Sequence, residues 1–274
     1  MNRVPLWDVH VREEFWELTG KFSLVLSLLL VVVDIPSAYK SWPLLVGLLT
    51  FLLLIYLVTW WQAQRVVHVD MRINDTAVCV RVGDIFDQPG LKVIAFNEFF
   101  DTIVDNQLVA ERSLNATFLR QHVADIAHLD HAIAHDAHLA VRRTRQVSRP
   151  HGNTQAYELG SICEYDGFLL TAFSRFDGEQ RAFLSTKDYI TCMLNFWQEV
   201  ERVYAGRAVV VPLMGAGITR FIGYSTISAQ ELLELMLYTL KLSRVSLRPG
   251  TTMTFVVRAS TRSRINFYKL RNLL

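Results

Sequence analysis

The chain has 274 residues, which is enough for one full domain and a smaller second one. Its formal net charge of +2 gives no electrostatic case for nucleic acid as a partner. The three cysteines, Cys79, Cys163 and Cys192, are odd in number and share no metal-ligand spacing, so we expect buried free thiols in a reducing compartment. The mean hydropathy of +0.22 is high for a soluble protein, and its source is local.

Two apolar segments near the N-terminus account for the hydropathy. Trp42 to Trp61 is twenty residues without a charge, and as a helix it would span about 30 Å, the thickness of a hydrocarbon core. Phe22 to Val33 is shorter and spans only if its flanks lie in the interfaces. Asp34 and Pro36 then mark the turn of a hairpin. Acidic residues crowd the N-terminal region and a second span follows, which disfavours a cleavable signal peptide.

Basic residues predict the orientation of the hairpin. Three precede the first span, one lies between the spans, and two follow the second. Both termini are therefore predicted to be cytoplasmic. The opening segment, Pro5 to Leu18, is amphipathic enough to lie along the interface. We predict an interfacial helix and transmembrane hairpin over residues 1–65 and a cytosolic domain over residues 66–274.

The second part of the chain alternates short apolar runs with helical stretches, which predicts an α/β sandwich with a mixed sheet. Ser185 with Asp188 and Ser228 with Glu231 are spaced as helix capping boxes. Tyr165-Asp166-Gly167 is typical of a hairpin turn. We expect strands over residues 66–73, 77–82, 91–96, 156–164, 168–176, 209–211 and 252–258, and helices over residues 114–141, 185–204, 228–243 and 263–274.

Four histidines lie on the long predicted helix. His128, His131, His135 and His138 fall on roughly the face opposite its apolar stripe. Two or three of them could bind Zn²⁺ or Ni²⁺. Four imidazoles along three turns cannot close a tetrahedron around one ion, however, so a solvated polar face is favoured and no metal is expected.

The stretch from Val209 to Phe221 carries the strongest pattern for ligand binding. A β-branched run ends at a proline and is followed by two glycines one residue apart and an arginine. Buried strand, glycine turn and helix is a layout in which backbone N–H groups can reach a phosphate. No Gly-Lys-Ser/Thr follows, and Arg220 stands where a dinucleotide fingerprint needs its third glycine. The alternative is that the glycines only make a tight turn.

Acidic, amide and aromatic residues follow two other predicted strands. Asp84 comes after one strand, and Asn97 to Asp101 comes after the next. An open α/β sheet binds its ligand at such strand ends. Asp84 could accept from an adenine amine, and Phe99 or Phe100 could stack on a base. The carboxylates could also serve acid–base chemistry, but the sequence gives no pairing geometry.

Three ordered landmarks resemble those of a macro domain. They are Val82 to Phe86, Lys92 to Thr102, and Val211 to Ile218. The likeness is greatest to the divergent macro domain of Thoeris anti-phage defence effectors, and the two N-terminal spans fit the type II arrangement.

This resemblance implies a function. Macro domains bind ADP-ribose, and type II effectors are thought to sense an ADP-ribose conjugate, such as histidine–ADP-ribose, made by a TIR-domain partner. The protein would then assemble as a homo-oligomer in the lipid bilayer of the bacterial inner membrane and disrupt it. No cofactor is implied. The expected ligand contacts are Asp84, Ile85, Phe86, Asn97, Glu98, Phe99, Phe100, Asp101, Leu213, Met214, Gly215, Ala216, Gly217, Ile218, Thr219 and Arg220.

The chain departs from the pattern of hydrolytic macro domains. Phe100 occupies the second position of their Asn-x-x-Asn pair, and Asp105-Asn-Gln-Leu-Val109 replaces their triple glycine. These departures favour a receptor without catalytic residues over the alternative, a membrane-anchored ADP-ribosyl hydrolase or ADP-ribose phosphoesterase.

Overall fold

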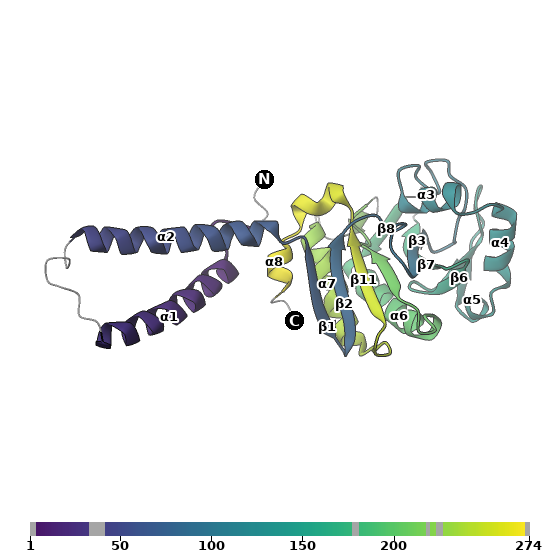
Figure 1. The fold of residues 1–274 in the computed structure, drawn as a ribbon. Helices are drawn as coiled ribbons and strands as arrows, with labels where there is room; N and C mark the ends of the chain where they lie inside the picture. Colours follow the sequence, from purple (N-terminus) through teal and green to yellow (C-terminus); the bar gives the residue numbers. More distant parts are fainter. Residues whose placement is uncertain (1–3, 33–41, 177–180, 218–219, 223–226, 272–274) are drawn as a thin grey trace. The chain divides into compact units, whose positions relative to one another are not determined.

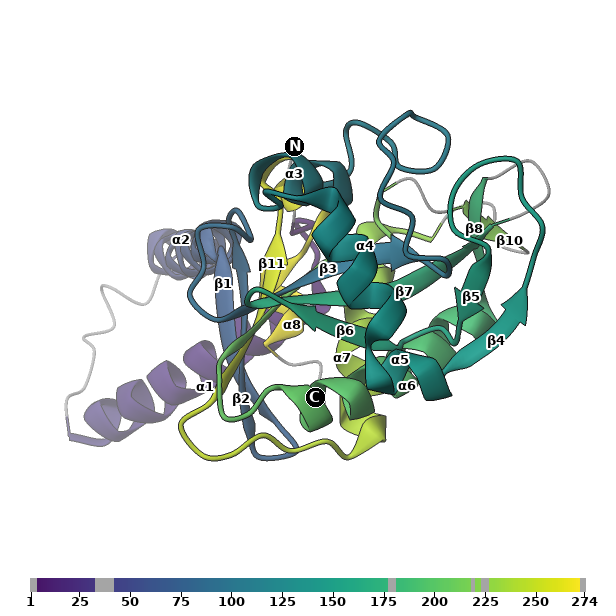
Figure 2. The ribbon, with the colours of Figure 1, turned by 90° about the vertical axis from the view of Figure 1, so that its right-hand side faces the viewer.

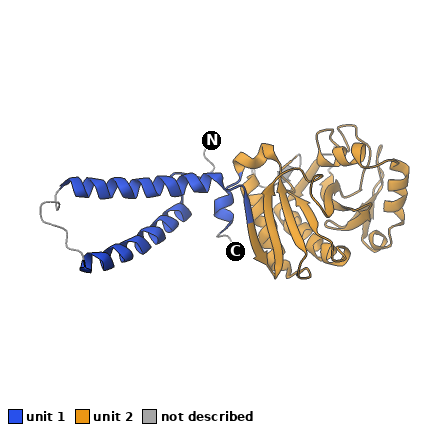
Figure 3. Cartoon of the chain, in the orientation of Figure 1, with its two compact units in different colours: residues 1–69, 265–273 blue, residues 70–264, 274 orange. Residues whose placement is uncertain are grey.

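The structure is a computed structural model that describes residues 4–32, 42–176, 181–217, 220–222 and 227–271 (Figure 1). By its internal contacts the chain forms two units, residues 1–69 with 265–273 and residues 70–264 (Figure 3). The sequence placed the boundary at residue 65 and assigned the C-terminal segment to the second domain, whereas its contacts group it with the N-terminal helices.

The first unit contains two long helices, α1 (Val9–Val32) and α2 (Trp42–Arg65). The ring centroids of Phe22 and Phe51 lie 5.1 Å apart, and those of Phe15 and Tyr56 lie 5.4 Å apart, so the two helices pack along each other. The segment expected to lie along the interface up to Leu18 is not a helix of its own, because α1 runs without a break from Val9 to Val32. Its place in an interface stays a prediction. The predicted turn at Asp34 and Pro36 lies outside the described residues.

Both helices are long and apolar enough to cross a membrane. Their most apolar windows are 0% and 6% buried, whereas the core helix of a soluble domain would be covered. Leucine side chains along both helices, such as Leu28 and Leu53, are exposed. This pattern is typical of helices whose surroundings are apolar.

The short helix α8 (Phe267–Leu270) belongs to the same unit. Tyr268 packs in an apolar cluster with Val4, Val11 and Ala63. Its hydroxyl donates to the Glu14 carboxylate. The helix α8 therefore packs against α1 and α2 through Tyr268.

The second unit is built on a mixed sheet, which confirms the predicted fold class (Figure 2). Its strand order is β1-β2-β11-β9-β3-β7-β8-β10, with β6 paired to β7. Five successive strands of the sheet, β2, β11, β9, β3 and β7, run parallel to one another. β6 and β8 both run antiparallel to β7. The strands are β1 (His68–Ile73), β2 (Thr76–Val82), β3 (Leu91–Asn97), β6 (Ile162–Tyr165), β7 (Phe168–Phe176), β8 (Ala182–Ser185), β9 (Val209–Pro212), β10 (Arg220–Ile222) and β11 (Thr252–Val257).

Helices cover both faces of this sheet. On one face α6 (Thr186–Val203) and α7 (Ala229–Ser243) pack, with Trp197 against Phe255 of β11 and Tyr189 against Phe173 of β7. On the other face α3 (Leu114–Gln121), α4 (Ile126–His135) and α5 (Ala137–Val141) share a core with β3 and β7. Ser185 and Ser228 cap α6 and α7, as the sequence predicts.

The long helix expected over residues 114–141 is wrong, because it is three helices. The side chains of Asp125 and Asp136 accept from backbone N–H groups that begin α4 and α5. The histidines are therefore split between two helices. His131 and His135 stack on each other, and the described residues include no group able to hold a metal ion.

The expected strand over residues 156–164 is also interrupted. Gly160 takes φ +91° between β5 (Gln155–Tyr157) and β6. β5 pairs instead with β4 (Arg143–Gln146), which the sequence did not predict.

Candidate functional site

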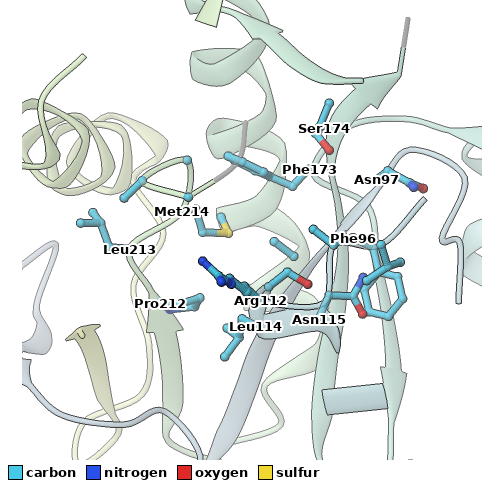
Figure 4. A pocket seen from close by; sticks show the side chains of 18 of the residues that line it. Phe96, Asn97, Arg112, Leu114, Asn115, Phe173, Ser174, Pro212, Leu213 and Met214 are labelled. Atoms are coloured by element: carbon cyan, nitrogen blue, oxygen red, sulfur yellow. The ribbon is translucent and has the colours of Figure 1, made fainter. Parts of the chain in front are cut away.

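A cavity of about 910 Å³ lies at the carboxyl ends of β3, β7, β9 and β11 (Figure 4). The parallel members of an open sheet place their ligands at this edge, and the volume is that of a small-molecule site. Its described walls come from six segments: residues 95–97, 106–115, 173–176, 181–182, 212–217 and 256–264.

The glycine loop after β9 forms one wall of the cavity. The backbone N–H of Leu213 donates to the Val256 carbonyl (3.2 Å), and the Tyr189 hydroxyl donates to the Met214 carbonyl (3.4 Å). Gly215 has φ +85°, which favours glycine. A Cβ added to Gly217 would meet none of the described atoms outside its chain neighbours within 4 Å. The loop is thus anchored at its start and leaves its backbone open to a ligand.

Five predicted residues of this loop line the cavity: Leu213, Met214, Gly215, Ala216 and Gly217. Ile218 and Thr219 lie outside the described residues. The backbone of Arg220 begins β10.

The charged residues that line the described part of the cavity are all arginines. Arg112, Arg181, Arg258 and Arg264 line it, and none of its described lining residues is acidic. Arg112, Arg258 and Arg264 are exposed and take part in no ion pair among the described residues. Sequence reasoning missed all four arginines, because no local motif marks residues that three separate segments bring to one edge. Together they give the described wall of the cavity a positive charge.

Asn97 lines the cavity, but its carboxamide is engaged with its own turn. Oδ1 accepts from the backbone N–H groups of Phe99 (3.0 Å) and Asp101 (3.2 Å), and Nδ2 donates to Asp101 Oδ2 (2.9 Å). The side chain therefore shapes the strand end behind the cavity.

The two carboxylates after β3 are buried and paired with arginines. Glu98 accepts from Arg145 (2.8 Å) and Arg175 (3.5 Å), and Asp101 from Arg149 (2.9 Å). Phe99 and Phe100 are buried as well. None of these predicted contacts, Glu98 to Asp101, lines the cavity in this structure. Neither Glu98 nor Asp101 is therefore without an arginine partner.

The predicted adenine contacts lie beside the cavity. Asp84 is exposed, and its Oδ1 accepts from the Phe86 backbone N–H (3.0 Å). Ile85 packs with Val256, which is itself a lining residue. Phe86 stacks on His122 at 4.5 Å. None of these three residues lines the cavity in this structure.

The fold and the site together define an α/β domain with a cavity at the carboxyl edge of its sheet, and this domain follows two apolar helices. The family model described as "Thoeris protein ThsA, Macro domain" matches residues 78–258. The Thoeris protein ThsA of Bacillus amyloliquefaciens (strain Y2) is 39% identical over 209 residues, covering 74% of this chain and 70% of that protein. The chain belongs to the Thoeris ThsA family of anti-phage defence proteins, and the resemblance drawn from the sequence is confirmed.

Solved macrodomain structures are similar at low sequence identity. The Oceanobacillus iheyensis macrodomain with ADP is 11% identical, with a TM-score of 0.49 over 75% of this chain and 94% of that chain. The same macrodomain with MES bound is 14% identical, with a TM-score of 0.47 over 75% of this chain and 95% of that chain.

Proposed function

We propose that the cavity is the receptor site for ADP-ribose or an ADP-ribose conjugate, such as histidine–ADP-ribose made by a TIR-domain partner. The observation that carries the proposal is the composition of the cavity wall. The glycine loop, Gly215 to Gly217, and four arginines line it, and none of its described lining residues is acidic. Backbone N–H groups and guanidinium forks are the donors that bind diphosphates in proteins.

The residues that line the cavity favour a receptor over a hydrolase. A hydrolase needs a group that activates water near the scissile bond. The carboxylates of Glu98 and Asp101 are held by arginines, and the Asn97 carboxamide is held by its own turn. A ligand in this cavity would therefore meet donors of hydrogen bonds and no general base among the described lining residues.

The apolar helices supply the response. In the proposed arrangement they span the bacterial inner membrane with both termini and the macro domain in the cytoplasm. Binding of the signal then favours a homo-oligomer whose hairpins disrupt the bilayer. A ligand can shift this equilibrium only as far as its affinities for the resting and assembled states differ.

The direct test is titration of ADP-ribose and of histidine–ADP-ribose into the full chain in detergent micelles, followed by calorimetry. We expect saturable binding of at least one of them, with the nucleotide unchanged when recovered. Absence of binding to both would overturn the receptor proposal. Recovery of cleaved nucleotide would favour the hydrolase or phosphoesterase instead.

The membrane step is tested separately. The full chain, reconstituted in vesicles that contain a self-quenched dye, should release the dye only after the ligand is added. Release without the ligand, or none with it, would contradict the proposed switch.

A further inference from the structure

Asn115 is a buried polar residue in the wall of the cavity (Figure 4). It lies in the first turn of α3, and the residue is 7% exposed. Within the described part of the chain, its Oδ1 has no hydrogen-bond partner. A buried carbonyl oxygen without a partner costs free energy, because it has lost its water and gained nothing in return.

Nothing in the local structure requires an amide at this position. The N-cap of α3 is Ser113, whose side chain accepts from the Ala116 backbone N–H (3.0 Å). The next residues of the helix, Ala116, Phe118 and Leu119, belong to an apolar core. An apolar side chain would suit the empty protein better than asparagine does.

The cavity offers a reason for the orphaned oxygen. Its arginines and backbone N–H groups are donors, which suit the phosphates of a ligand and leave the sugar hydroxyls to find acceptors. Arg112 lies three residues before Asn115 and lines the same cavity. In ADP-ribose each phosphate is esterified to a ribose. A phosphate at Arg112 would therefore bring ribose hydroxyls to this wall.

We propose that Asn115 Oδ1 accepts a hydrogen bond from a sugar hydroxyl of the bound ligand and so determines specificity for a sugar nucleotide over other diphosphates. This inference rests on the proposed function. Asn115 is a binding residue whose polar group destabilises the empty domain and is satisfied only when the ligand is present.

The chain offers a matched control in Thr171 of β7. Its Oγ1 is also buried without a partner, but Thr171 does not line the cavity. Asn115→Leu and Thr171→Val each remove one orphaned oxygen and keep the side chain close to its original size. Both variants should therefore unfold at the same temperature as the wild type or higher, when no ligand is present.

Calorimetry on the full chain in detergent separates the two variants. We expect Asn115→Leu to weaken ADP-ribose binding by roughly 10-fold, because a sugar hydroxyl loses its acceptor. Thr171→Val should leave the affinity unchanged. Asn115→Ala, which also removes the acceptor, should weaken binding even if the leucine variant folds poorly.

Deoxy analogues of ADP-ribose identify the group involved. One analogue that lacks a single hydroxyl should bind the wild type weakly and bind Asn115→Leu no worse than ADP-ribose does. Equal affinity of wild type and both Asn115 variants for ADP-ribose, or the same penalty for every deoxy analogue in both proteins, would overturn the inference. Failure of the wild type to bind ADP-ribose or its histidine conjugate would instead overturn the proposed function.

Discussion

Arg149 and Asp101 form a two-point ion pair in the interior of the macro domain. Nη1 lies 3.2 Å from Oδ1 and Nη2 lies 2.9 Å from Oδ2, and the side chains are 7% and 0% exposed. The guanidinium also lies over the Phe99 ring, 4.0 Å from its centroid. The pair fixes the turn after β3, which includes the left-handed Phe100 (φ 52°) and adjoins the cavity wall at Asn97.

Removing one partner of this pair should be costly. Arg149→Met leaves the Asp101 carboxylate buried without its countercharge, and such losses cost about 3–5 kcal/mol. We expect the unfolding temperature to fall by on the order of 10 °C in a thermal-shift experiment. Arg120→Met is the control, since Arg120 and Glu111 pair at 3.4 Å with both side chains more than half exposed. That variant should change stability by less than about 1 kcal/mol.

The turn that carries Arg149 depends on a glycine. Gly152 has φ +83°, and an added Cβ would lie 2.5 Å from Asp101 Oδ1. Gly167 has a similar φ of +79°, but a Cβ there would meet nothing within 4 Å in the part of the chain that the structure describes. We expect Gly167→Ala to cost about 1 kcal/mol from backbone strain alone. Gly152→Ala should cost clearly more in the same denaturation experiment, and equal losses would contradict the clash.

Asp130 should make stability depend on pH. Burial raises its pKa above the ordinary value, and the nearby Asp101 charge adds to this, while a hydrogen bond from Thr102 lowers it. Because the folded state binds the proton more tightly, the wild type loses stability as pH rises through the folded-state pKa. Asp130→Asn should therefore be more stable than the wild type at neutral pH.

The advantage of Asp130→Asn should shrink as pH falls, because both side chains are then neutral. Unfolding temperatures measured for the two proteins from neutral pH down to the ordinary aspartate range test this. An advantage that stays constant across that range would show that the carboxylate is not the cause.

The cysteines should differ in reactivity. Burial raises the pKa of Cys163 to about 12 and also raises that of Cys192. Cys79 is only partly buried, and its pKa is raised to about 11, mainly by desolvation. A higher thiol pKa means less thiolate, which is the reactive form. In native protein at neutral pH, a maleimide should label Cys79 slowly and the other two only after unfolding. Rapid native labelling of Cys192 would contradict its buried position.

Local patterns made much of the fold predictable. Ser228 and Glu231 form the expected reciprocal capping box at the start of α7, and Asp166 and Gly167 take positive φ in the expected hairpin turn. These features depend on residues close together in the chain. The broken helix was missed because Asp125 and Asp136 read equally well as the polar face of one long helix or as the caps of two shorter ones.

The candidate site was predictable only in part. The glycine loop stands out in the sequence and lines the cavity, whereas Arg112 and Arg264 meet there because parallel strands bring distant segments to one edge. Asn97 illustrates the opposite case. Its type and position suggest a ligand contact, but its hydrogen bonds to the backbone of its own turn depend on coordinates that no sequence pattern contains. The predicted contacts at Asp84 to Phe86 stay a prediction.

Substitution of Gly217 tests most directly the claim that this cavity binds the diphosphate of an ADP-ribose ligand. An added Cβ there lies more than 4 Å from the described atoms outside its chain neighbours, so we expect the empty protein to remain folded. Gly217→Glu places a carboxylate beside the lining arginines, and Gly217→Gln adds nearly the same volume without the charge. Calorimetry with the full chain should show that Gly217→Glu abolishes ADP-ribose binding and that Gly217→Gln weakens it less. Wild-type affinity in a folded Gly217→Glu protein would contradict the account.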